Sequence, residues 1–257
     1  MGIPNKMSPV AVEMLPEGYT RLAYLESDSN QHINLGFKMT NEHSVTCTYT
    51  PLSFVWINAY YGANAGFNFW ASYDYNGAFG RRCSASIGTA EGVKPQNSKV
   101  DTQLGQTYTS YLSATRFKVD GVVDQPIEGV PEFVTTKNCA LFKFHASNGS
   151  WGTCGAVRIH AFRAEKNGVA VCEVAPALDP KGRPCMYDLV THKPFYNLRT
   201  GEFIAGLASV ENVRNLYLPS TGGILTLGAP AETTEEDINQ LKSNNPTWEL
   251  TVNLRTA

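Results

Sequence analysis

The sequence has few charged residues and no cluster of one sign. Asp, Glu, Lys and Arg together make up 17% of the 257 residues, and the formal net charge is −2 at pH 7. A nucleic-acid-binding protein needs a basic face to neutralise phosphates, and no run of Lys or Arg supplies one here. We therefore expect no nucleic-acid partner.

Long apolar runs are also missing. The longest are a few residues, whereas a membrane-spanning helix needs about 20 consecutive apolar residues. The first residues, Met1–Val12, contain no apolar core of signal-peptide length. We therefore expect no membrane insertion, and no signal peptide is visible, although a signal that has already been cleaved would leave the same sequence.

Cysteine and histidine do not occur in the spacings of metal sites or disulfide scaffolds. The six cysteines include no C-x-x-C pair, which favours buried free thiols. If one pair is bridged, we would choose Cys172 and Cys185, which lie on candidate neighbouring strands. His43 and Cys47 would be about 13 Å apart on a strand, too far to share a zinc ion. We therefore predict no cofactor.

The sequence is rich in aromatic residues, and many of its segments alternate apolar and polar side chains. Tyr and Phe occur 12 times each, and residues 33–37 alternate apolar and polar side chains, as a half-buried strand does. Asn76-Gly77 and Asp120-Gly121 have the form of hairpin turns, and 88–99 has the composition of a loop. Further strands are expected at 19–25, 44–49, 53–61, 67–73, 106–113, 115–119, 140–145, 156–163 and 169–174. This spacing predicts a mainly β sandwich or barrel.

The last 50 residues follow a different pattern. Ile224–Leu227 and Trp248–Leu254 are predicted strands. Between them, Thr233–Glu236 has the Thr-x-x-Glu form of a helix-starting capping box, and the helix should end near Asn244, before a proline. We therefore predict a small C-terminal β-α-β module over residues 207–257.

Segments near both ends of the chain carry a resemblance to a known family. Residues 15–27 read LPEGYTRLAYLES, 31–36 read QHINLG, 157–162 read VRIHAF, and 186–203 run from MYDLV to GEF. In this order they resemble the opening and closing segments of laminin-G-like, concanavalin A-like jelly rolls found in gut bacterial proteins and phage tail or virion proteins. The resemblance covers residues 15–206 and implies a two-sheet antiparallel jelly-roll sandwich whose first and last strands meet. Residues 1–14 would form an exposed N-terminal arm.

The resemblance also suggests a role. It implies a non-catalytic binding protein, a component of a phage virion or tail or of a cell surface, that recognises host glycans or partner proteins. Its location would be the virion or the extracellular surface, and its partners would include other virion subunits and further copies of itself. A purely structural virion subunit without a ligand is the alternative, because fold does not fix function. Tyr187 and Asp188 in the closing segment are interpreted as structural: the tyrosine packs and the aspartate caps a turn.

Exposed aromatic residues are the candidate glycan-binding residues, since sugars present C–H faces that stack on aromatic rings. Tyr60, Tyr61, Tyr73 and Tyr75 flank predicted turns and are expected to be exposed, whereas packing in the core is the alternative for most aromatics on strands. The predicted ligand-binding residues are Tyr60, Tyr61, Trp70, Tyr73, Tyr75 and Trp151.

A laminarinase-type glycoside hydrolase is a further alternative, because such enzymes share the jelly roll and carry Glu-x-Asp-x-x-Glu on one strand. Here the segment Glu26–Gln31 ends in a glutamine, which cannot act as a general acid. We therefore expect no catalytic residues. Calcium occurs in some laminin-G-like domains and is the one cofactor left open; Asp120, Asp124 and Glu128 are close in sequence, but their spacing does not fit an EF-hand loop.

Overall fold

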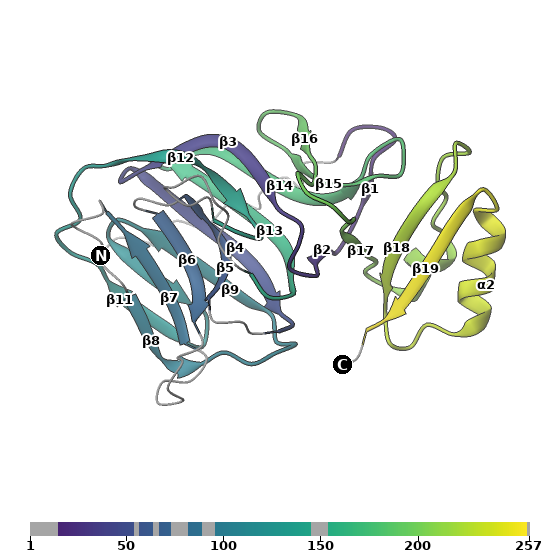
Figure 1. Cartoon of the computed structure of the whole chain (residues 1–257), viewed down its shortest axis with the longest axis horizontal. Coiled ribbons are helices and arrows are strands. Elements are labelled where there is room, and N and C mark those ends of the chain that lie inside the picture. Colours follow the sequence, from purple (N-terminus) through teal and green to yellow (C-terminus); the bar gives the residue numbers. More distant parts are fainter. Residues whose placement is uncertain are drawn as a thin grey trace, which may run out of the picture.

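The computed structural model describes residues 15–53, 57–63, 67–72, 82–88, 96–144 and 154–255. In these ranges the fold is mainly β, a two-sheet antiparallel jelly-roll sandwich with a small C-terminal module beside it (Figure 1). The arm predicted for residues 1–14 and the turn predicted at Asn76-Gly77 lie outside the described residues. No helix among the described residues is long and apolar enough to cross a membrane.

The smaller sheet of the sandwich has six strands and is antiparallel throughout. Its order is β3 (Ile33–Thr40), β12 (Val134–Leu141), β5 (Ile57–Ala63), β6 (Phe67–Ser72), β7 (Arg82–Ile87) and β8 (Gln96–Asp101).

The larger sheet has 13 strands and extends beyond the sandwich. Its main path is β11 (Val123–Pro126), β10 (Arg116–Val119), β9 (Tyr108–Ser113), β4 (His43–Pro51), β13 (Val157–Lys166), β2 (Tyr24–Ser27), β17 (Ile204–Gly206), β18 (Gly223–Ala229) and β19 (Trp248–Leu254). A branch leaves this path at β13 and consists of β14 (Val169–Leu178), β1 (Thr20–Arg21), β15 (Pro184–Asp188) and β16 (Lys193–Phe195).

The branch arises because β13 changes neighbour along one edge. Val157–Ile159 pair with β2, whereas Phe162–Lys166 pair with β14, and β4 follows the other edge. A register shift against β4 falls between Ile159 and Ala161, at the point of the change. Bulges of this kind bend a strand and redirect its side chains. We call this place the fork.

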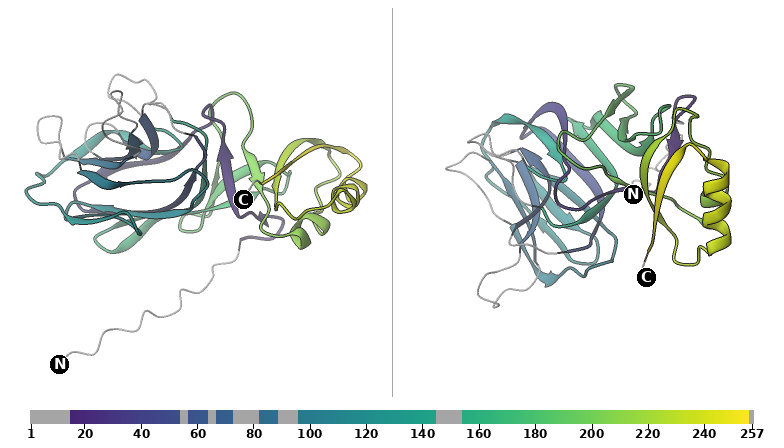
Figure 2. Two further views of the ribbon diagram at one scale, coloured as in Figure 1. Left: turned by 90° about the horizontal axis from the view of Figure 1, so that it is seen from below. Right: turned by 45° about the vertical axis from the view of Figure 1, so that its right-hand side comes forward.

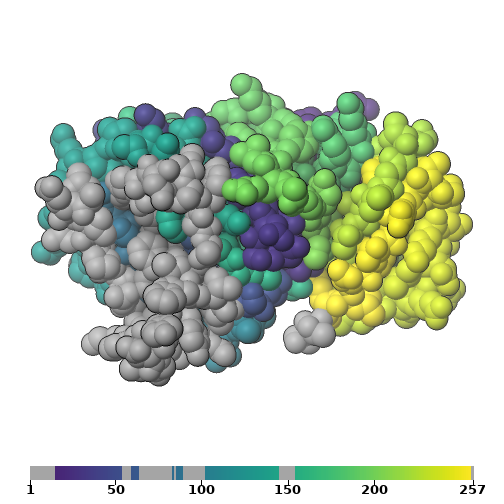
Figure 3. Space-filling model, in the orientation of Figure 1, coloured from purple at the N-terminus to yellow at the C-terminus, as the bar shows by residue number. Residues whose placement is uncertain are grey.

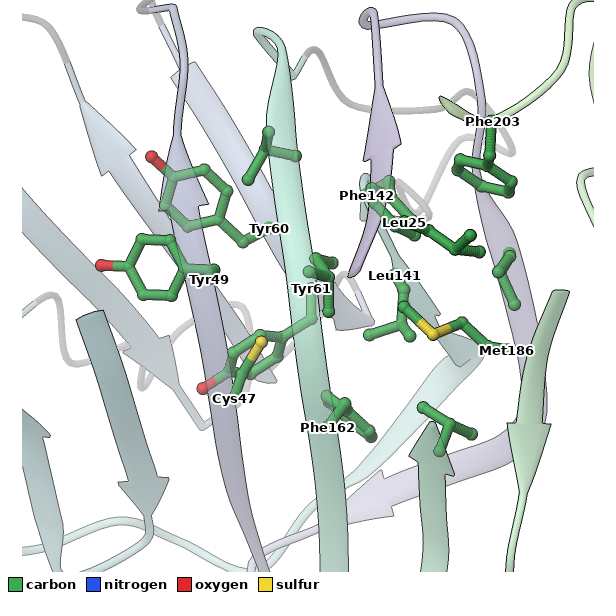
Figure 4. Packing of buried hydrophobic residues seen from close by; sticks show 14 of the residues in the cluster. Leu25, Cys47, Tyr49, Tyr60, Tyr61, Leu141, Phe142, Phe162, Met186 and Phe203 are labelled. Atoms are coloured by element: carbon green, nitrogen blue, oxygen red, sulfur yellow. The ribbon is translucent and has the colours of Figure 1, made fainter. Parts of the chain in front are cut away.

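The core lies between the two sheets and is rich in tyrosine and phenylalanine (Figure 4). The rings of Tyr49 on β4 and Tyr60 on β5 have their centroids 4.4 Å apart. Tyr61 meets Phe162 on β13 edge to face at 5.5 Å. Such pairs bury large apolar areas from both sheets at once and hold the sandwich together.

The opening and closing segments meet, as the resemblance implies. β2 and β17 pair antiparallel, with Leu25 opposite Ala205. The Gln31 side chain donates to the carbonyl of Glu202 at 3.2 Å, and the backbone N–H of His32 donates to the Asn197 side chain at 3.2 Å.

The structural interpretation of Tyr187 and Asp188 is confirmed. Asp188 accepts hydrogen bonds from the backbone N–H groups of Glu173 and Val190 at 2.9 and 3.1 Å, so its carboxylate holds the turn after β15. Tyr187 is buried and packs edge to face against Tyr19 at 4.7 Å.

The C-terminal module contains the predicted strand, helix and strand. β18 and β19 are parallel, and the helices α1 (Val210–Arg214) and α2 (Glu235–Asn244) lie on one side of them (Figure 2). Helix α2 ends at Asn244 as predicted. The sequence analysis did not predict α1, which is only five residues long.

The predicted position of the capping box at the start of α2 was wrong by one residue. The capping box is formed by Thr234 and Asp237 rather than by Thr233 and Glu236. The Asp237 carboxylate accepts from the backbone N–H and the hydroxyl of Thr234 at 2.8 and 2.7 Å. A short carboxylate at this position therefore closes the box one residue later than the Thr-x-x-Glu pattern indicates.

The sheet continues across the predicted domain boundary. β17 ends at Gly206, pairs antiparallel with β2 on one side and pairs parallel with β18 on the other. Figure 3 shows the module as a yellow lobe beside the sandwich. The divisions at 15–206 and 207–257 stay predictions.

Several strand limits differ from those predicted. Residues 96–101 form β8, so the segment 88–99 is not a loop throughout. The strand predicted at 140–145 begins at Val134 and ends at Leu141. Two register shifts along β12 break the alternation that sequence analysis relies on. The Asp120-Gly121 turn is confirmed between β10 and β11, where Gly121 has φ 71°.

Candidate functional site

The aromatic residues predicted to bind a ligand do not form an exposed platform in the described part of the chain. Tyr60 is 1% exposed and Tyr61 is 0% exposed, so the prediction that both are exposed is wrong. Both belong to β5, which faces the larger sheet with these rings (Figure 4). A glycan cannot reach either side chain. Trp70 lies on β6, but its side chain, like Tyr73, Tyr75 and Trp151, is outside what the structure describes.

The hydrolase-like segment is engaged in structural contacts. Glu26 forms an ion pair with Arg158 on the neighbouring strand at 2.7 Å. Asp28 accepts from the backbone N–H of Asn30 at 3.1 Å. The side-chain amide oxygen of Gln31 accepts from the Ser27 hydroxyl at 2.9 Å, which places the glutamine side chain inside the turn after β2. Glu26 therefore links β2 to β13, and Asp28 and Gln31 shape the turn between β2 and β3.

The cysteines are buried free thiols, as the C-x-x-C argument favours. The guessed bridge between Cys172 and Cys185 is absent, because Cys185 lies opposite Ala177 on β14, whereas Cys172 lies opposite Ala164 on β13. Burial raises the pKa of Cys185 to about 12, so its thiol stays protonated and weakly nucleophilic at neutral pH.

Two of the three acidic residues considered for calcium form ion pairs. Asp124 holds Arg116 through two hydrogen bonds of 2.8 and 2.7 Å, and Asp120 lies 2.6 Å from Lys118. A search of the described residues finds no group of three or more Cys, His, Asp or Glu side chains arranged to hold a metal ion.

A pocket of about 250 Å³, lined by both apolar and polar side chains, lies at the fork. Its lining comes from five places in the chain that only the sheet brings together: β1, β4, β13, β14 and the turn after β15. We call it the fork pocket. Its lining residues are Arg21, Thr46, Thr48, Ala161, Phe162, Arg163, Glu173, Val174, Ala175 and Leu189.

Small apolar side chains and hydroxyls make up one part of the fork pocket. Ala161 is exposed and Ala175 is buried, and neither extends far from the backbone. Thr46 and Thr48 lie on β4, opposite Arg163 and Ala161. The Thr48 hydroxyl is 3.2 Å from that of Thr109, so the threonine is held in place.

Charged groups of both signs make up the other part. Arg163 donates to Glu165 at 2.8 Å and to Glu173 on the neighbouring strand. The hydrogen bond to Glu165 is the main reason that the pKa of Arg163 is raised. Arg21 reaches the same pocket from β1. The pocket thus offers fixed donors and acceptors beside a small apolar surface.

His160 lies at the register shift of β13 that forms the fork. His160 contacts the Thr50 hydroxyl at 2.8 Å through Nε2 and the carbonyl oxygen of Ala23 at 3.1 Å through Nδ1. Burial lowers the pKa of His160. Both ring nitrogens are therefore used to hold β13 against β2 and β4, and we assign this histidine a supporting role.

Sequence reasoning missed the fork pocket, although one signal was present. Ser44, Thr46 and Thr48 occupy every second position of β4 and alternate with the buried Val45, Cys47 and Tyr49. A row of hydroxyls on the outward face of a strand is available to a polar ligand. No local pattern showed that Arg21, Glu173 and Leu189 would join them.

No protein-family model matches the sequence, and none of the curated proteins matches it. Among solved structures, a heptameric SAP-like pentraxin from Limulus polyphemus aligns over 55% of this chain and 76% of its own, with TM-score 0.39 and 10% identity. Galectin-Ib from Xenopus laevis aligns over 53% of this chain and 100% of its own, with TM-score 0.32 and 13% identity. A tetrameric galectin from the ball sponge Cinachyrella sp. aligns over 52% of this chain and 98% of its own, with TM-score 0.33 and 16% identity.

Proposed function

We propose that the chain is a non-catalytic binding protein whose jelly roll recognises host glycans at the fork pocket, as a component of a phage virion or tail or of a cell surface. The observation that supports the binding role is the fork pocket itself, in which a small apolar surface lies beside hydroxyls and charges of both signs. Ligand pockets typically combine an apolar lining with a few placed polar groups.

A sugar ring fits this combination of groups. Its C–H face can lie over Ala161 and Ala175, which leave room above the sheet. Its hydroxyls can donate to Glu173 and accept from Arg163, while Thr46 and Thr48 can do either. The ion pairs of Arg163 and the contact between Thr48 and Thr109 fix these groups before a ligand arrives, which lowers the entropic cost of binding.

The non-catalytic reading has a chemical basis. Glycoside hydrolysis requires two carboxyl groups flanking the scissile bond. Glu173 supplies the one carboxylate among the residues lining the fork pocket, and it is already bonded to Arg163. Of the acids in the hydrolase-like segment, Glu26 is paired with Arg158 on β13 and Asp28 accepts a hydrogen bond in the turn after β2.

We make a separate proposal for where the protein acts and for what it assembles with. The resemblance of the opening and closing segments to phage and gut bacterial jelly rolls supports a place on a virion or cell surface. We propose a host glycan or host-surface protein as the ligand, and other virion subunits and further copies of the chain as assembly partners.

A glycan array followed by calorimetry on each hit tests the binding role. Replacing Ala161 with tryptophan would fill the fork pocket without removing a polar group, and we expect it to abolish binding. A tryptophan at Val134, an exposed position on the smaller sheet, is the matched control and should leave binding unchanged. Circular dichroism would confirm that both variants are folded.

Other results would lead elsewhere. Binding that survives the Ala161→Trp substitution would place the ligand outside the fork pocket. A negative array together with self-association in light scattering would favour the purely structural subunit.

A further inference from the structure

Arg21 differs from the other arginines within the strands of the larger sheet. Arg116, Arg158 and Arg163 each form an ion pair with a carboxylate of the same sheet. In the described part of the chain, the Arg21 guanidinium has neither an ion pair nor a side-chain hydrogen bond. Its charge is therefore available to a group from outside the protein.

Arg21 is an exposed residue, and only part of its side chain packs against the fork. Burial against the fork lowers the pKa of Arg21, because part of its guanidinium is removed from water. A partly buried cation is stabilised when an anion pairs with it and destabilised when none does. An arginine that lines a pocket and forms no ion pair among the described residues is a candidate to bind an anionic group of a ligand.

The nearest carboxylate on the same wall does not meet this need. Glu173 lines the fork pocket together with Arg21 and attracts it electrostatically. Its carboxylate is hydrogen-bonded to Arg163, however, and Arg163 also holds Glu165. Arg163, Glu165 and Glu173 together carry one net negative charge, which attracts Arg21, but no hydrogen bond or ion pair joins Arg21 to them. The guanidinium donors of Arg21 remain unfilled.

We propose that the fork pocket selects acidic glycans, and that Arg21 binds the carboxylate or sulfate of the sugar. This inference rests on the proposed glycan-binding function. Guanidinium groups present paired N–H donors that match the two oxygens of a carboxylate or sulfate. The sugar ring would lie over Ala161, while Thr46 and Thr48 take its hydroxyls.

Matched trisaccharides test the proposal by calorimetry on the full chain. Trigalacturonate carries carboxylates, sulfated galactotriose carries sulfates, and galactotriose is the neutral counterpart of both. We expect at least one acidic sugar to bind about tenfold or more tighter than the neutral one, because a hydrogen bond to a charged group is worth more than a neutral one. The sugar that gains this affinity identifies the acidic group.

Substitutions at Arg21 assign the effect to one side chain. Arg21→Gln should lower the affinity for the acidic sugar to that for the neutral sugar. Arg21→Lys should retain part of the preference, since it keeps the charge but loses the paired donors. Arg116→Gln removes an exposed arginine of the same sheet and should change neither affinity.

The outcomes separate this inference from the proposed function. Equal affinity for neutral and acidic sugars, blocked by Ala161→Trp but unaffected by Arg21→Gln, would overturn the acidic preference and leave glycan binding in place. An acidic preference that survives both Arg21→Gln and Ala161→Trp would be non-specific attraction and would also overturn it. If none of the three sugars binds and the glycan array is negative, both proposals fail.

Discussion

The hydroxyl group of Tyr24 occupies the space in which a side chain on Gly228 would lie. A Cβ added to Gly228 would overlap the Tyr24 hydroxyl oxygen, and one added to Gly206 would overlap the carbons of the same ring. The guanidinium groups of Arg158 and Arg255 lie 4.7 and 5.0 Å from the ring centroid. One tyrosine of the opening segment therefore packs the jelly roll against the C-terminal module.

This packing predicts a specific rescue. Gly228→Ala should lower the free energy of unfolding by about 1–3 kcal/mol, as overpacking does. Tyr24→Phe should relieve much of this loss, because the overlapping atom is the hydroxyl oxygen and the next ring atom would lie 3.2 Å from the added Cβ. Urea unfolding of the single and double variants measures the coupling.

Gly206→Ala is the matched control for this cycle. Its Cβ would meet ring carbons that phenylalanine retains, so Tyr24→Phe should not rescue it. Equal rescue of both glycine variants, or of neither, would show that the Tyr24 hydroxyl is not the atom in conflict.

Substitution of a buried tyrosine should reduce the stability of the fold rather than remove a direct contact with a ligand. Tyr61→Ala should lower the free energy of unfolding by about 3–5 kcal/mol, because it removes a fully buried ring that contacts Phe162 across the sandwich. Chemical denaturation measures the change. A Tyr61→Ala protein of unchanged stability that no longer bound a glycan would restore the aromatic-cluster hypothesis.

The burial of the six cysteines predicts that their thiols are unreactive in the native protein. Burial raises the pKa of Cys83, Cys139 and Cys154 to about 12. At pH 8 we expect a thiol reagent such as Ellman's to react very slowly with the folded protein, and with all six thiols in denaturant. Rapid reaction of the folded protein would show that at least one thiol is accessible.

The capping box predicts an acid-sensitive module. The hydrogen bonds from Thr234 and then from Arg214 lower the pKa of Asp237 to about 2. Because the folded pKa lies below the unfolded value near 3.9, this carboxylate stabilises the fold above about pH 4, and the contribution is lost as pH falls toward 2. Thermal unfolding between pH 6 and pH 2 measures it.

Asp237→Asn should weaken this acid dependence while keeping the size of the side chain. Glu236→Gln is the control, since it removes a charge from the same turn of α2 but none of the contacts with Thr234 and Arg214. If both variants have the same pH profile as the parent, Asp237 does not carry the effect.

Local features of the sequence predicted local features of the structure. Alternation placed β4 and β19, a turn dipeptide placed the hairpin at Asp120-Gly121, and the capping pattern placed α2 to within a residue. Each of these depends on neighbours in the chain, because side-chain direction alternates along a strand and a helix cap is formed within four residues.

The tertiary structure decided which face of each strand is buried and where the candidate site lies. Tyr60 and Tyr61 flank a predicted turn, which indicated exposure, but both lie within β5, where a register shift after Ala59 breaks the alternation and packing against the other sheet buries both rings. The fork pocket exists because β13 exchanges β2 for β14 beside Ala161, which brings Arg21 next to Thr48 and Glu173. Strand pairing between distant segments sets such neighbours, and a local pattern does not encode it.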